Sequence, residues 1–250
     1  MSSRSIYAVG DIHGFIDQLD WALAQIEKDG GEDAEIVFLG DLVDRGPDSR
    51  AVINRLSDGI EAGRNWTVLC GNHDDLFATF LETGNLYTPR VKSGLPWSDP
   101  RLGGLETLRS YGVDVDRLAP TDLLSAARDH VPHRHLKFIR SLPHYTQRGG
   151  LMMVHGGLKP GVPMAQQDPQ DLMWIRTGFL DYPNPYPWVV VHGHTALSQP
   201  EHLGNRVNLD SGAGYGRPIT AAVFEMGQVW TLSPFGREPL RQKPNPYPDL

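Results

Sequence analysis

The chain has 250 residues, of which 40% are apolar and 21% are charged. This composition is typical of a folded globular protein and excludes a chain that is disordered throughout. A formal net charge of −7 argues against a general affinity for nucleic acid, because such binding depends on Lys and Arg side chains that neutralise phosphates. It does not exclude an anionic substrate, since a few cations and bound metal ions can reverse the potential inside an acidic protein.

The sequence gives no reason to expect a membrane partner or an oxidising compartment. No apolar run approaches the roughly 18 to 20 residues that cross a bilayer. The first seven residues lead directly into a strand pattern and lack the apolar region of a signal peptide, so the cytoplasm is the expected compartment. Cys70 is the only cysteine, which excludes an internal disulfide and a cluster of thiolate metal ligands.

Three units of a strand followed by a helix are expected at the start of the chain. Apolar runs at residues 6–9, 36–39 and 67–70 predict short buried strands. The helix after the first run begins near Asp17, the second carries apolar residues at positions 52, 56 and 60, and the third begins near Asp75. Strands that alternate with helices in this way predict a parallel sheet with right-handed crossovers.

The pattern changes after residue 84. Residues 84–150 contain prolines and short amphipathic stretches, which predict a mostly helical insertion that lies over the sheet. Strands are then expected at residues 151–154, 188–191, 207–209, 221–225 and 229–232, the last two joined by a hairpin turn at residues 226–228. We expect one domain over residues 1–236 and a Pro-rich tail, extended and poorly ordered, over residues 237–250.

Five of the predicted strands end in short polar motifs with nitrogen and oxygen donors. Each residue alone is more often a turn residue or a structural histidine, but five such motifs in succession favour a metal-dependent hydrolase. Asp11 and His13 are two residues apart and can chelate one divalent ion, and Asp41 offers two oxygens that could bridge two ions. The motifs are Gly10-Asp11-Ile12-His13-Gly14, Gly40-Asp41-Leu42-Val43-Asp44-Arg45-Gly46, Gly71-Asn72-His73-Asp74, His155-Gly156-Gly157 and His192-Gly193-His194-Thr195.

From about residue 5 to residue 233, these motifs resemble those of the calcineurin-like metallophosphoesterases. Within that superfamily, the chain is similar to the phosphoprotein phosphatase branch in its bacterial serine/threonine form. The resemblance implies an α/β fold, a sandwich of two mixed β-sheets flanked by helices (α/β/β/α). It also implies that the metal ligands lie on loops at an edge that the sheets share.

The resemblance also implies a role for each motif residue. The first metal ion would be held by Asp11, His13 and Asp41, and the second by Asp41, Asn72, His155 and His194. His73 would act as the general acid and Asp44 would orient it, while Arg45 and Arg176 would bind the phosphate. Two divalent ions would activate the attacking water. The ligand types suit manganese, iron or zinc and do not choose among them, and manganese is the first expectation.

The sequence leaves the roles of several residues in or near these motifs open. His192 is an alternative ligand to His194, since the two would share a strand face, and the motif match favours His194 with His192 behind it. His130, His133 and His135 are expected to face solvent. Four further side chains are candidate substrate contacts or ordinary packing residues: Tyr87, Arg90, Trp97 and Tyr215.

The expected reaction is hydrolysis of a phosphomonoester, with phosphorylated Ser or Thr in proteins as the first substrate and a small phosphoester as an alternative. The nearest rival family, the symmetrical dinucleoside tetraphosphate hydrolases, typically has alanine where this chain has Asp44. An inactive phosphopeptide-binding module would be expected to have lost a ligand or His73, and none is missing. The oligomeric state is left open by the sequence.

Overall fold

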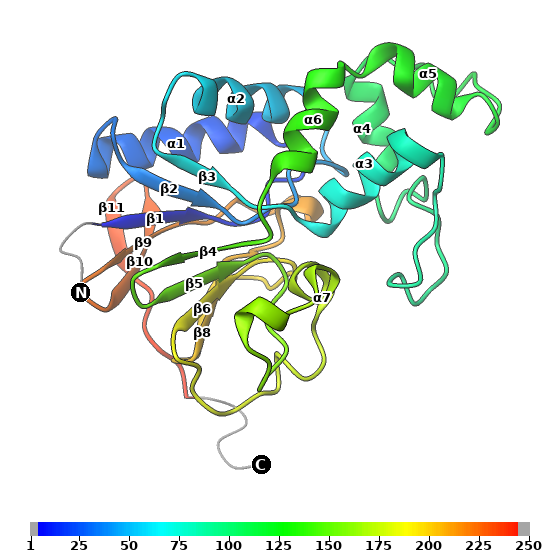
Figure 1. The fold of residues 1–250 in the computed structure, drawn as a ribbon. Coiled ribbons are helices and arrows are strands. Elements are labelled where there is room, and N and C mark those ends of the chain that lie inside the picture. Colours follow the sequence, from blue (N-terminus) through cyan, green and yellow to red (C-terminus); the bar gives the residue numbers. More distant parts are fainter. Residues whose placement is uncertain (1–4, 245–250) are drawn as a thin grey trace.

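The structure, a computed structural model, describes residues 5–244. Two mixed β-sheets lie face to face with helices on both outer sides (Figure 1). The strand order is β11-β10-β9-β1-β2-β3 in the first sheet and β4-β5-β6-β8-β7 in the second. The strands are β1 (Ile6–Val9), β2 (Glu35–Phe38), β3 (Trp66–Val68), β4 (Tyr145–Arg148), β5 (Leu151–Val154), β6 (Val189–His192), β7 (Glu201–His202), β8 (Arg206–Asn208), β9 (Ala221–Glu225), β10 (Gln228–Ser233) and β11 (Gly236–Pro239).

Each sheet has a parallel set of three strands. In the first sheet β1, β2 and β3 are parallel, as the sequence predicts, whereas β9, β10 and β11 are antiparallel. In the second sheet β5, β6 and β8 are parallel, and β4 and β7 are antiparallel edge strands. The predicted hairpin between β9 and β10 is confirmed: Met226 and Gly227 both have positive φ, as a tight two-residue turn requires.

Apolar side chains alternate along the strands and divide the core into three layers. In β1, Tyr7 packs against the helices, whereas Ala8 packs between the two sheets. In β6, Val191 packs between the sheets whereas Val190 faces α7. The helices of the described residues are α1 (Ile16–Gly30), α2 (Ser49–Glu61), α3 (Asn72–Thr83), α4 (Gly104–Ser110), α5 (Leu123–His130), α6 (His133–Ser141) and α7 (Pro169–Trp174).

The insertion is helical, as expected, but it does not lie over a sheet. Its helices α4, α5 and α6 pack against α2 and α3, at the side of the sandwich in Figure 1. Arg128 of α5 donates hydrogen bonds to two carbonyls at the end of α3, and apolar faces of the insertion continue the core under α2 and α3. The insertion ends in β4, an edge strand that its polar, alternating sequence did not reveal.

The first residues of the tail are extended, as expected, but the expectation that they are poorly ordered is wrong. Residues 236–239 form β11 on the edge of the first sheet, where Arg237 makes ion pairs with Asp29 at 2.8 Å and Glu225 at 2.9 Å. Residues 245–250 of the predicted tail lie outside the described part. No helix among residues 5–244 is long and apolar enough to cross a membrane.

Candidate active site

The candidate site lies where the carboxyl ends of the six parallel strands meet. Segments after β1, β2, β3, β6 and β8 line one cleft. His155, after β5, contacts Asn72 and Asp41 of these segments. Two glycines allow this close approach. A Cβ on Gly71 would lie 2.2 Å from the Asp41 nitrogen, and one on Gly193 would lie 2.0 Å from Asp11 Oδ1. A side chain at either position would force the strand ends apart.

Backbone strain is concentrated in the same segments. Six non-glycine residues among residues 5–244 have positive φ; one of them lies in the β9–β10 turn. The other five, with φ between 50° and 73°, are His13, Asp41, Asp44, Arg45 and His194. Each such residue costs of order 1 kcal/mol or more, so the surrounding contacts must hold it in place. The side chains of Asp11 and His13 therefore do not project from one face of an extended strand, as the sequence suggested, because the chain turns at His13.

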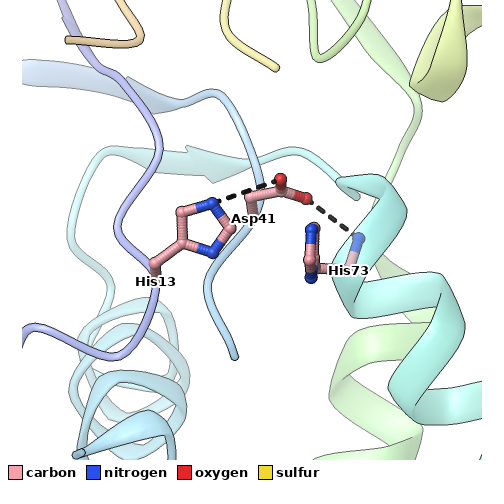
Figure 2. Close-up of side chains that lie close together, drawn as sticks. All are labelled: His13, Asp41 and His73. Carbon is pink, nitrogen blue, oxygen red and sulfur yellow. Dashed lines mark hydrogen bonds and ion pairs between the residues drawn. The ribbon is translucent and has the colours of Figure 1, made fainter. Parts of the chain in front are cut away.

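Asp41 lies between two imidazole rings. Figure 2 shows the His13 ring directed at the Asp41 carboxylate. His13 Nδ1 lies 2.9 Å from the Val43 carbonyl, which leaves Nε2 3.6 Å from Asp41 Oδ2. His155 Nδ1 lies 2.8 Å from the Leu39 carbonyl, and its Nε2 is 3.2 Å from Asp41 Oδ1. Backbone acceptors of this kind orient the Nε2 atoms of metal ligands, so the arrangement fits a carboxylate that bridges two ions.

The other predicted ligands lie around this centre. Asn72 Oδ1 is 3.0 Å from His155 Nε2, and the ring centroids of His155 and His194 are 5.2 Å apart. Asp11 accepts the His194 backbone N–H at 3.1 Å, and its Oδ2 is 4.0 Å from His13 Nε2. Two sets of donor atoms, each within 4.8 Å of one another, could hold an ion: His13, Asp41 and His73, and Asp41, His155 and His194. The structure brings all six predicted ligands together; which of them bind each ion stays a prediction.

The electrostatics of the cluster fit bound cations. Burial, followed by the neighbouring Asp210 carboxylate, raises the pKa of Asp11 well above its usual value. Burial also opposes the charged form of His155, but the Asp41 and Asp11 carboxylates outweigh it and raise the pKa of His155 to about 9. Burial lowers the pKa of His194 well below its usual value, which favours the neutral ring that a ligand needs, whereas His155 would release a proton when an ion binds. Buried carboxylates this close together are stabilised when a cation lies among them.

His194 and His192 do not share a strand face, so the sequence interpretation is wrong on this point. β6 ends at His192, and the chain turns at His194, which has φ 64°. The His192 ring packs edge-on against Phe179 at 4.9 Å, on the α7 side of the sheet. The His194 ring lies beside His155 and Asp41. His194 is therefore the candidate ligand of the two.

His73 lies on the first turn of α3, not in a loop before it. The helix begins at residue 72, earlier than predicted, because the Asp74 carboxylate accepts hydrogen bonds from the Gly71 and Leu42 nitrogens at 2.8 and 2.9 Å and caps the helix start. The His73 ring donates from Nδ1 to Asp44 Oδ2 at 2.7 Å. Its Nε2 atom is therefore the one available to the cleft.

Asp44 is completely buried, and two side chains of the insertion contact its carboxylate. Trp97 Nε1 donates to Oδ2 at 2.7 Å, and Thr107 Oγ1 donates to Oδ1 at 2.6 Å. The suggestion that Trp97 contacts substrate is wrong, because its side chain is fully buried. Tyr87 does not line the cleft either, whereas Arg90 does and is paired with Asp171 at 2.9 Å.

Both candidate phosphate-binding arginines face the cleft. The Arg45 guanidinium lies 3.1 Å from His13 Nε2 and 3.3 Å from His73 Nε2, and it stacks on Tyr215 at 4.8 Å. Arg176, just after α7, donates to the His194 carbonyl at 3.0 Å. The cleft has a volume of about 1230 Å³ and contains six cationic side chains: Arg45, Arg90, Lys92, Lys159, Arg176 and Arg217.

Some residues of the site were missed in the sequence. Asp210 is buried, lines the cleft beside Asp11 and lies two residues after the end of β8. Its position after a predicted strand was the same signal that marked the other motifs. Thr107 carried no comparable signal. Outside the site, the expectation that His135 faces solvent is wrong. Its side chain is buried because α6 turns this face toward α2, and its ring forms hydrogen bonds with Tyr111 and Asn54.

The sequence model of the calcineurin-like phosphoesterase family matches residues 4–223, which is most of the chain. The protein belongs to this family. Its two-sheet fold and the polar edge described above agree with that assignment, and the family is one of metal-dependent phosphoesterases. The resemblance read from the motifs is thus confirmed at the level of family and fold.

Similar proteins differ in how much of the chain they match. The asymmetrical bis(5'-nucleosyl)-tetraphosphatase PrpE of Bacillus velezensis is 27% identical over 240 residues, covering 86% of this chain and 87% of its own length. A symmetrical bis(5'-nucleosyl)-tetraphosphatase of Bordetella parapertussis is 41% identical, but over 70 residues, or 28% of this chain and 24% of its own. A solved structure described as a putative diadenosine tetraphosphatase has a TM-score of 0.64 at 23% identity, covering 92% of this chain and 93% of its own.

Proposed function

We propose that the protein is a phosphomonoesterase that hydrolyses phosphorylated Ser and Thr side chains with two divalent metal ions, manganese first. The observation that carries this proposal is the pair formed by His73 and Asp44. A carboxylate that accepts the Nδ1 proton at 2.7 Å presents the opposite ring nitrogen, Nε2, to the cleft. An imidazole held in this way is suited to protonate a leaving oxygen.

The need for an acid depends on the leaving group. An alkoxide released from phosphoserine or phosphothreonine is about as strong a base as hydroxide, so it leaves poorly unless it is protonated. A phosphate leaving group, as released from a dinucleoside polyphosphate, has a pKa of about 6 and leaves readily without a proton. A buried, fully bonded Asp44 behind His73 is thus most useful for an alkyl phosphomonoester.

The remaining residues have complementary roles in this proposal. Asp41 joins the two halves of the ligand cluster, with an imidazole at each oxygen. When bound, the divalent ions would supply Lewis acidity that activates water and offsets phosphate charge. Arg45 and Arg176 bind the non-bridging phosphate oxygens with their planar donors. His73 then delivers its proton to the leaving oxygen.

A second candidate is asymmetrical cleavage of dinucleoside tetraphosphates. Two observations favour it: the relative so named aligns over most of both chains, and the cleft has more cations than one phosphate group uses. Lys92 and Lys159 are both exposed at this cleft, and neither makes an ion pair with a described residue. The symmetrical enzyme of Bordetella parapertussis, from the rival family considered from sequence, matches 28% of the chain.

A substrate panel distinguishes the two candidates. We expect phosphoserine or phosphothreonine peptides to exceed diadenosine tetraphosphate in kcat/KM with the manganese-loaded protein. The His73→Asn variant should lose about 10² to 10⁴ in kcat with the peptides and less with p-nitrophenyl phosphate, whose leaving group needs little protonation. If diadenosine tetraphosphate is preferred by about tenfold or more, equivalent to about 1.4 kcal/mol of transition-state stabilisation, the second candidate replaces the first.

A further inference from the structure

We propose that Trp97 and Thr107, both in the insertion, are positioning residues that hold Asp44 and thereby orient the general acid His73. The proposal rests on the acid role of His73 given above. It assigns to the insertion a part in the reaction centre, although neither side chain touches the cleft. The insertion would then contribute to catalysis as well as to the shape of the cleft.

The contacts of Asp44 carry this inference. Oδ2 accepts hydrogen bonds from His73 Nδ1 and from Trp97 Nε1, both at 2.7 Å. Oδ1 accepts from the Thr107 hydroxyl at 2.6 Å, and the same hydroxyl accepts the Asp44 backbone N–H at 2.8 Å. Ser49 Oγ lies 3.1 Å from the Asp44 nitrogen and from Thr107 Oγ1. Two of the three side-chain donors to this carboxylate thus come from the insertion.

Trp97 is itself fixed in position. Its ring stacks on Phe77 with centroids 5.7 Å apart and packs against Phe80 at 5.0 Å. The start of α4 lies on the indole, since a Cβ on Gly104 would be 2.4 Å from the ring. The direction of the Nε1–H bond is therefore set by the packing of the insertion on α3. A shift of the indole would move Asp44, and with it the His73 ring.

The insertion also holds the backbone on which Asp44 lies. Asp44 and Arg45 both have left-handed backbone geometry, with φ 73° and 70°. The Arg45 nitrogen donates to the Gly103 carbonyl at 3.2 Å, and a Cβ on Gly103 would lie 2.3 Å from that nitrogen. One turn of the insertion thus supports both the residue behind the acid and a phosphate-binding arginine. Misplacing a reacting group by about 1 Å can lower a rate about 100-fold, so such support matters for the rate.

The test compares leaving groups in variants that each remove one side-chain donor to the Asp44 carboxylate. Trp97→Phe keeps an aromatic ring among Phe77 and Phe80 but removes the donor, and Thr107→Val keeps the shape but removes the hydroxyl. With a phosphothreonine peptide we expect each to lower kcat about tenfold with KM within about twofold. With p-nitrophenyl phosphate the loss should stay under about twofold. Thr107→Ser, which keeps the hydroxyl, should retain the peptide activity.

Two controls separate positioning from stability. Val229→Ala removes apolar packing between the two sheets, in a cluster separate from the one that holds Trp97, so it should lower Tm but leave the ratio of the two activities unchanged. In a His73→Asn background, Trp97→Phe should cause no further loss of kcat, because two residues that act through one group are not additive. The low-field proton resonance of His73 Nδ1–H should shift in Trp97→Phe, which provides a readout independent of turnover.

The outcomes distinguish this inference from the proposed function. If His73→Asn lowers the activities with both substrates equally, the acid role of His73 is wrong and the inference falls with it. If His73→Asn discriminates between the substrates but Trp97→Phe and Thr107→Val do not, the inference alone is overturned. An additional loss from Trp97→Phe in the His73→Asn background would also overturn it.

Discussion

At the scale of single residues, Arg45 connects the two parts of the proposed reaction centre. Its guanidinium lies within 3.3 Å of both His13, a candidate metal ligand, and His73, the candidate acid. Tyr215 covers it at 4.8 Å and limits its movement. A phosphate bound between the metal ligands and the acid would therefore meet a guanidinium that is already in place, and Arg176 reaches the same cleft from the other sheet.

Removing either arginine should weaken phosphate binding and slow the reaction. We expect Arg45→Ala and Arg176→Ala to raise KM for p-nitrophenyl phosphate and to lower kcat, since the phosphoryl oxygens carry charge throughout the reaction. Competitive inhibition by inorganic phosphate should weaken in parallel. Lys variants keep the charge but lose the paired donors, so they should recover part of the loss. Unchanged kinetics in Arg176→Ala would show that this residue was wrongly assigned from the motif.

The residues that the sequence identified share a simple local signal. Asp11, Asp41 and His155 each follow an apolar run that predicts a buried strand, and the structure places all of them at one edge. Trp97 and Thr107 could not be assigned in this way. Their contact with Asp44 spans 53 and 63 residues and depends on how the insertion packs on α3, which a local pattern does not specify.

At the scale of elements, α6 ties the insertion to the body of the protein through a buried histidine. His135 Nδ1 lies 2.9 Å from the Tyr111 hydroxyl, and Nε2 lies 2.9 Å from Asn54 Oδ1 in α2. An amide oxygen only accepts, so Nε2 carries the proton and Nδ1 accepts from tyrosine. Burial, aided by Arg134 and Arg50, lowers the pKa of His135 to about 4.

This histidine should make the stability of the protein depend on pH. In the unfolded chain His135 takes up a proton near pH 6.5, whereas in the folded chain it does so only near pH 4. Its contribution is therefore present above about pH 6.5 and is lost as the pH falls toward 4. We expect Tm to fall less steeply over this range in His135→Gln than in the wild type. The exposed His133→Gln on the same helix serves as the control and should leave the slope unchanged; an unchanged slope in His135→Gln would contradict the assignment.

Elements with strong apolar patterns were predicted from the sequence, and those without were missed. The strands at residues 6–9, 151–154 and 221–225 have the predicted bounds. The short edge strands β4, β7 and β11 are polar or contain proline, because an edge strand buries little surface. Their place in a sheet follows from pairing with a neighbour, which the sequence of the strand alone does not encode.

At the scale of the whole molecule, two sheets place their parallel strands so that both sets of polar ends meet. The resemblance implied this sandwich, whereas the residues alone predicted only the parallel and antiparallel parts separately. The layer between the sheets combines small and β-branched side chains such as Ala8 and Val191 with larger ones such as Phe224. Asp41 from the first sheet and His155 from the second are thereby brought within 3.2 Å of each other.

We propose that this edge of the sandwich holds two divalent ions with Asp41 between them. Titration of chelator-treated protein with Mn²⁺ in a calorimeter tests it directly. We predict two equivalents per chain, with hydrolysis of p-nitrophenyl phosphate restored as the ions bind. Asparagine tolerates the positive φ of position 41, so Asp41→Asn should keep the fold. It should weaken metal binding and activity together, whereas His73→Asn should spare the ions. Full activity in verified metal-free protein, or stoichiometric binding that Asp41→Asn leaves unchanged, would contradict this two-metal site.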